Sequence, residues 1–149
     1  MDTCKPIVVS RILSSSMESV FDAWLDPDLA RHFLFATPGT ILVRTDINPK
    51  IGGGFIITRR EAEDIEHIGT YVEINRPTRL AFSFVVPLFS NQETEVQIDI
   101  QSAPSGCLLT LVHKGVPTEW QELAPSGWET ILSQLANLLA KNSSQGIKD

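Results

Sequence analysis

Apolar residues follow two different periods along this chain. From residue 41 to residue 114, short runs rich in β-branched and aromatic residues are separated by turn residues, a pattern that predicts strands. From residue 128 to residue 139, apolar side chains recur at the i, i+3, i+4 and i+7 spacing of one helix face. The pattern therefore predicts consecutive strands followed by a helix.

Seven strands are predicted in all. They cover residues 7–13, 41–47, 55–60, 65–74, 80–86, 94–101 and 107–113. Because the last six follow one another with short connections, we expect an antiparallel meander. The glycines at 52–54 predict a bulge or a close backbone approach where the sheet bends.

Two short helices are predicted between the first two strands. Ser15 and Glu18 have the spacing of a capping box, which begins a helix. The apolar face of that helix consists of Val20, Phe21, Trp24 and Leu25. The proline of Asp26-Pro27-Asp28 ends it, and a second helix is expected over about residues 29–33.

The C-terminal helix has the strongest pattern. Ser126 and Glu129 form a second capping box. Its apolar stripe consists of Trp128, Ile131, Leu132, Leu135, Leu138 and Leu139. About 14 helical residues, roughly 21 Å long, should therefore lie across the sheet. Residues 142–149 are expected to form a flexible polar tail, so that a single α+β domain has its core within about residues 7–140.

Composition and charge make several classes of binding partner unfavourable. The 149 residues are 42% apolar and 20% charged, which is ordinary for one globular domain. With 12 basic against 18 acidic residues the net charge is −6, so nucleic acid and anionic membranes are poor partners. No run is long enough for membrane insertion and no signal peptide is evident. A cytoplasmic monomer or homodimer is expected.

Short motifs at the joints of the predicted elements resemble one known family. They are Val20 to Trp24 with Asp26-Pro27, the glycines before Phe55, Gly69 to Ile74, Pro77 with Arg79 to Phe82, Gly106 to His113, and Gly127-Trp128. Together they resemble the START-like superfamily (also called SRPBCC), in the branch named for the activator of the heat-shock-protein-90 ATPase. The resemblance covers about residues 7–140 and implies a helix-grip fold, with a curved antiparallel sheet around the last helix.

The cavity that this arrangement implies has candidate lining residues. They are Trp24, Phe33, Phe55, Ile57, Arg59, Tyr71, Phe82, Phe84, Ile98, Leu109, Leu111, His113, Trp128, Leu132 and Leu135. Strand alternation places His113 beside Leu111, either as a hydrogen-bonded structural group or as a group that orients a ligand. Strand register leaves open whether Thr70 or Tyr71 faces inward.

Arg59 falls on the same strand face as Phe55 and Ile57 if Phe55 points inward. An inward arginine needs a carboxylate partner or the anionic head of a ligand. The alternative is that Arg59, near the strand end, reaches solvent. Val85 to Phe89 form an apolar stretch that interrupts the strand pattern at Pro87, so they form a lid, a dimer contact or part of the core.

No catalytic or metal-binding motif is evident. The chain lacks a nucleophile elbow, a Rossmann fingerprint and a P-loop. Its histidines lack metal-ligand spacing, so no metal or cofactor is expected; His32 and His67 are predicted to lie at the surface. The spacing of Cys4 and Cys107 predicts no disulfide, and Cys107 is expected in the core.

The sequence therefore favours a binding module for a small apolar or amphipathic molecule over an enzyme. The resemblance implies two alternatives, because its superfamily includes lipid and hormone binders, small cyclases and co-chaperone domains, and fold does not fix function. One is a regulator that contacts a chaperone ATPase. The other is a small lyase or cyclase that uses His113 with Glu129 or Asp22 as an acid.

Overall fold

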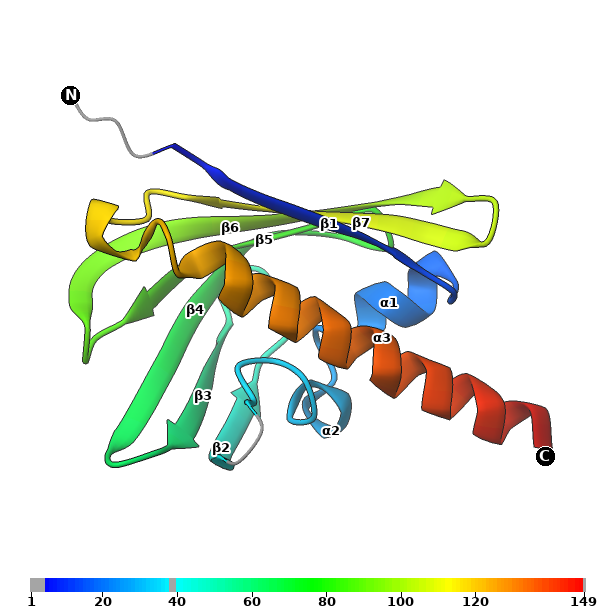
Figure 1. Ribbon diagram of the computed structural model, residues 1–149, viewed down its shortest axis with the longest axis horizontal. Coiled ribbons are helices and arrows are strands. Elements are labelled where there is room, and N and C mark those ends of the chain that lie inside the picture. Colours follow the sequence, from blue (N-terminus) through cyan, green and yellow to red (C-terminus); the bar gives the residue numbers. More distant parts are fainter. Residues whose placement is uncertain (1–4, 38–39, 149) are drawn as a thin grey trace.

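One antiparallel sheet forms the body of the computed structural model, which describes residues 5–37 and 40–148 (Figure 1). Seven strands of this part of the chain pair in the order β1-β7-β6-β5-β4-β3-β2. Their bounds are β1 Ile7–Leu13, β2 Ile41–Ile47, β3 Gly54–Arg60, β4 Asp64–Asn75, β5 Arg79–Val86, β6 Ser90–Ala103 and β7 Gly106–Lys114. All seven predicted strands are confirmed, and the meander from β2 to β7 is closed by β1 alongside β7.

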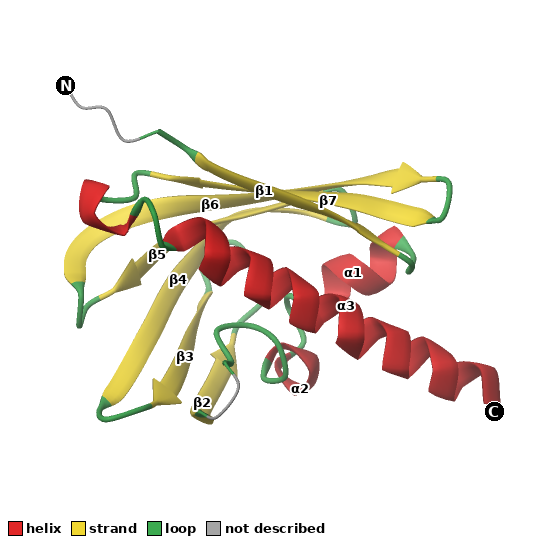
Figure 2. Cartoon of the chain, in the orientation of Figure 1, coloured by secondary structure: helices red, strands yellow, loops and turns green. Residues whose placement is uncertain are grey.

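Helices cover one face of this sheet (Figure 2). The short helices α1 (Met17–Ala23) and α2 (Pro27–Ala30) connect β1 to β2, and a 3-10 turn η1 (Thr118–Trp120) follows β7. The long helix α3 (Ala124–Lys148) crosses the hollow of the curved sheet (Figure 1). The predicted helix-grip fold is confirmed.

The caps of the short helices differ from the prediction. The N-cap of α1 is Ser16, whose hydroxyl accepts a hydrogen bond from the backbone N–H of Ser19, so the Ser15 capping box was wrong by one residue. Helix α2 begins at Pro27, two residues before the predicted start. The Asp26 carboxylate caps it through the N–H of Asp28, and proline at the first helical position supplies a ready-made helical φ.

Helix α3 is longer than its apolar stripe. It begins at Ala124, so Ser126 lies within the first turn and the predicted cap there was wrong. It continues as helix to Lys148 instead of ending in a tail after Leu139, because no proline interrupts the polar sequence that follows the stripe. None of the helices in the described ranges is both long and apolar enough to cross a membrane.

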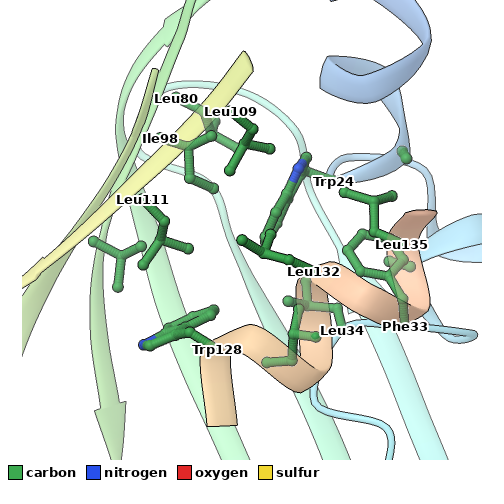
Figure 3. Packing of buried hydrophobic residues seen from close by; sticks show 14 of the residues in the cluster. Trp24, Phe33, Leu34, Leu80, Ile98, Leu109, Leu111, Trp128, Leu132 and Leu135 are labelled. Carbon is green, nitrogen blue, oxygen red and sulfur yellow. The ribbon is translucent and has the colours of Figure 1, made fainter. Parts of the chain in front are cut away.

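The middle of α3 packs against a filled core (Figure 3). Leu132, Leu135 and Leu139 are buried, as the stripe predicted, against side chains from α1, from the segment after α2 and from the sheet. Figure 3 shows Trp24, Phe33 and Leu34 gathered with Leu132 and Leu135. Cys107 is buried as predicted, whereas Cys4 lies outside the described residues.

Two glycines allow the backbones of strands β3 and β4 to approach each other closely. A side chain at Gly54 would collide with the carbonyl group of Gly69, and one at Gly69 would collide with the ring of Phe55. The close backbone approach predicted for the glycines before Phe55 is therefore confirmed.

Candidate functional site

A cleft of about 390 Å³ opens at the N-terminal end of α3. Its walls come from the first turns of α3, the β5–β6 hairpin, the segment between β7 and α3, and the loop after α2. This volume is in the range of small-molecule sites. Most of the lining is apolar, including Phe84, Val86, Phe89, Trp120 and Trp128.

Stacked rings form one side of the cleft. Phe35 lies parallel to the ring of Phe84, with centroids 5.1 Å apart, and to the imidazole of His67, with centroids 4.3 Å apart. Phe35 has a positive φ of 60°, which is uncommon for a bulky residue and is maintained only when the surroundings require it. The loop after α2 is thus held in a conformation that places an aromatic ring in the cleft.

Two side chains hold that loop. Arg59 donates a hydrogen bond from Nη1 to the carbonyl oxygen of Phe35, at 3.1 Å. Gln134 of α3 donates from Nε2 to the carbonyl oxygens of Phe33 and Ala36. The loop is therefore attached both to β3 and to α3, and neither attachment was visible in the sequence because each joins residues far apart in the chain.

His113 is fixed in a chain of hydrogen bonds. The indole N–H of Trp128 donates to its Nδ1 at 3.0 Å, so Nδ1 carries the lone pair and Nε2 carries the proton. Nε2 then donates to Thr94 Oγ1 at 2.7 Å, and the Thr94 hydroxyl donates to the carbonyl oxygen of Phe84 at 2.9 Å. Burial lowers the pKa of His113 to about 4, so the ring is neutral at pH 7.

His67 is also buried and neutral. Its Nδ1 lies 3.0 Å from the carbonyl oxygen of Ile57, which only accepts, so Nδ1 carries the proton. Burial, with the nearby Arg59 charge adding to it, lowers the pKa of His67 to about 4. The prediction that His67 lies in solvent was wrong, because the ring of Phe35 covers it; the surface position of His32 is confirmed.

Arg59 is the charged group of the cleft. It is turned inward, with 16% of its side chain exposed, and its Nε lies 2.8 Å from a Glu61 carboxylate oxygen. That contact is an ion pair without the alignment of a hydrogen bond. The inward position and the carboxylate partner considered from the sequence are both found, and the solvent-directed alternative is wrong.

The mouth of the cleft carries exposed apolar side chains. Phe89 of the β5–β6 turn packs on Trp120 of η1, with ring centroids 5.1 Å apart. Phe89 and Leu88 remain 48% and 44% exposed. The segment from Val85 to Phe89 therefore borders the cleft, and the core alternative is wrong for Leu88 and Phe89.

Only part of the predicted lining falls on the cleft. Arg59, Phe84, His113 and Trp128 line it. The other candidates lie in the packed core: Trp24, Phe33, Phe55, Ile57, Tyr71, Phe82, Ile98, Leu109, Leu111, Leu132 and Leu135. They were misplaced because strand and helix patterns identify inward-facing residues but not the place where their packing leaves space. Tyr71 is inward and Thr70 is exposed, which settles the register.

Several cleft residues were missed. Phe35 and Gly127 carried no site signal, although Phe35 belongs to an apolar run, Phe33-Leu34-Phe35, that follows a short helix. Thr94 falls by alternation on the inward face of β6, with Val96 and Ile98, so strand alternation could have pointed to it. Gly127 lies in the first turn of α3, where a side chain would meet open space.

The curved sheet, the helix across it and the cleft at the helix N-terminus define a protein of the helix-grip class. Residues 14–140 match the family described as Activator of Hsp90 ATPase homolog 1-like protein. The chain belongs to this family, which confirms the START-like resemblance of its motifs. No curated protein matches the sequence.

Solved structures share the fold at low sequence identity. Protein CV1439 from Chromobacterium violaceum is 23% identical with a TM-score of 0.80, over 89% of this chain and 96% of that one. The AHSA1-like protein from Aeromonas hydrophila is 21% identical with a TM-score of 0.80, over 93% and 94%. Protein SA2116 from Staphylococcus aureus, described as of unknown function, is 13% identical with a TM-score of 0.84, over 95% and 97%. These likenesses show the fold alone.

Proposed function

We propose that the protein binds a small apolar or amphipathic molecule in the cleft at the N-terminal end of α3. The observation that carries this proposal is a cleft of about 390 Å³ with aromatic walls and few polar groups, beside a core of buried side chains. Apolar surface left open in this way gains free energy when a ligand removes it from water. Membership in the family matched over residues 14–140 is consistent with a ligand-binding or a regulatory role.

Catalysis by His113 is disfavoured by its hydrogen bonds. A general base needs a lone pair directed at the proton that it removes. The lone pair of His113 Nδ1 accepts from Trp128, and Nε2–H donates to Thr94. Asp22, considered as an acid, instead forms an ion pair with Arg76 outside the cleft. These contacts favour a structural and orienting role for His113.

Gly127 offers a direct test of binding. A Cβ atom added there meets no atom within 4 Å, and Gly127 lines the cleft, so the ring of Gly127→Phe is expected to occupy cleft space while the fold is retained. Gly127→Ala is the matched control, because it adds one methyl group at the same position. Phenylnaphthylamine, a neutral probe whose fluorescence rises in apolar sites, should bind the wild type and Gly127→Ala and bind Gly127→Phe at least tenfold more weakly. Equal binding by all three, or none by the wild type, would refute the proposal.

A chaperone-regulating role is a second proposal, and it comes from the description of the family. It requires contact with a partner protein instead of, or in addition to, a small ligand. Stimulation of an Hsp90 ATPase by the purified protein would support it. The absence of stimulation, with phenylnaphthylamine binding retained, would leave the cleft as the functional site and exclude that partner.

A further inference from the structure

We propose that the cleft selects anionic amphipathic molecules, with Arg59 receiving the acidic head and the aromatic walls receiving a planar apolar body. This inference rests on the proposed function, since it names the class of ligand. The inference goes beyond the proposed function by assigning the recognition of the ligand's charge to one residue, Arg59. Three features of the cleft support it.

The first feature is the sign of its charge. The chain carries 18 acidic against 12 basic residues, yet the lining of the cleft contains no aspartate or glutamate among the described residues and contains Arg59. His67 and His113 also line it, and both are neutral at pH 7. Among the residues that line the cleft, a cationic ligand would therefore meet a positive charge and no carboxylate, whereas an anion would meet one attractive charge.

The second feature is the unused donor capacity of Arg59. A guanidinium has five N–H groups, and it binds carboxylates and similar anions through two parallel hydrogen bonds. In the described part of the chain, one of these groups donates to Phe35, and Nε lies beside Glu61 without a hydrogen bond. Because Glu61 is 42% exposed and outside the lining, an acidic head can approach Arg59 from the cleft without displacing it.

The third feature is the shape and polarity of the rest of the cleft. The cleft is lined by four aromatic side chains, Phe84, Phe89, Trp120 and Trp128, and such a lining suits a planar apolar body. The first turn of α3 also opens on the cleft at Gly127, and helix N-termini favour negative charge. An acid attached to an aromatic or similarly flat skeleton would satisfy both the rings and Arg59.

Two probes with the same body separate charge recognition from apolar binding. Anilinonaphthalene sulfonate carries an acidic group, and phenylnaphthylamine has the same ring system without it. The wild type is expected to bind the sulfonate roughly tenfold or more tightly than the neutral probe, the effect of one charge-assisted contact. Arg59→Met should abolish this preference and leave the neutral probe bound, while Arg59→Lys should retain part of it.

Arg60→Met is the control for net charge. This substitution removes the same positive charge one residue further along the chain. Arg60 is exposed, pairs with Asp64 and lies outside the cleft lining. Its variant should keep the wild-type preference. Circular dichroism and thermal unfolding of each variant identify any loss of fold, and Arg59→Lys, which can still donate to Phe35, keeps the test decisive if Arg59→Met unfolds.

The outcomes distinguish this inference from the proposed function. Tight binding of both probes with no preference, or a preference that Arg59→Met and Arg60→Met reduce equally, would overturn the role of Arg59 and leave the cleft as a neutral apolar site. Failure of the wild type to bind either probe would overturn both proposals. A preference lost only at Arg59 would establish the assignment.

Discussion

The two ends of the interface between α3 and the rest of the domain differ in how closely they are packed, although one apolar stripe of α3 runs through both. Around Leu135 the helix meets Trp24 and Phe33, and all three side chains are buried. Around Trp128 the same stripe faces a cleft, whose lining includes the small residues Gly127 and Ala124. The comparison teaches that periodicity determines which face of a helix is buried, whereas the volumes of distant side chains determine whether a cavity is left beside it.

Among changes to a single residue, truncation at the buried end is expected to have the largest effect. Leu135 is fully buried, so Leu135→Ala should lower the free energy of unfolding by about 3 kcal/mol. Ile131→Ala, beside the existing space of the cleft, should lower it by roughly half as much, because part of its surface already lacks packing partners. Urea unfolding at pH 7 measures both, and equal losses would mean that the two ends are packed alike.

Protonation by acid is expected to have the next largest effect per residue, at the two buried histidines of the cleft end. The pKa values of His67 and His113 are lowered from 6.5 to about 4 in the folded state, so between these values the unfolded chain binds more protons. Stability is therefore complete above about pH 6.5 and is lost as the pH falls toward 4. The expected loss between pH 7 and pH 5 is about 2 kcal/mol per histidine.

Urea unfolding at a series of pH values tests this dependence. His113→Gln should remove about half of the slope between pH 7 and pH 5, because His67 continues to titrate. A wild-type stability that is constant over this range would contradict the buried, neutral state of both rings.

Interrupting the hydrogen-bond chain at Thr94 should have a smaller effect. Thr94→Val keeps the volume but removes the acceptor of His113 Nε2–H and the donor to Phe84, which should cost about 1 kcal/mol. Thr110→Val, on the opposite face of β7, is the control and is expected to change little. The same cost at both positions would show that the chain of hydrogen bonds contributes nothing specific.

The smallest effect is expected at Gly127, and it has the opposite sign. Gly127→Ala should raise the free energy of unfolding by about 0.5 kcal/mol, since alanine favours the helix and its methyl group meets open space. Thermal unfolding measures it. A decrease would mean that the first turn of α3 is more closely packed than described.

Much of the fold was predictable because its signals are local. Turn residues and alternating apolar positions gave every strand to within a few residues, including β1 and β2 without error in their bounds. The helix starts were less accurate, since Ser14-Ser15-Ser16 offers three capping serines and only the chain geometry selects Ser16. The residue at which a helix begins depends on a single capping hydrogen bond, which the amino-acid sequence alone does not identify.

The site was predictable only in part because it depends on contacts between distant segments. Inward positions of Arg59 and His113 followed from strand alternation. The burial of His67 requires Phe35 to fold over it with a positive φ, and that conformation depends on Arg59 and Gln134. No local pattern encodes such a combination.

The three tryptophans provide the most direct test of the central claim that ligands enter the cleft and not the core. Trp120 and Trp128 line the cleft, whereas Trp24 lies in the filled core. In a proton–nitrogen correlation spectrum each indole N–H gives one signal, and titration with phenylnaphthylamine should shift those of Trp120 and Trp128 while that of Trp24 stays in place. A shift centred on Trp24, or no shift of any indole at saturating probe, would contradict the account.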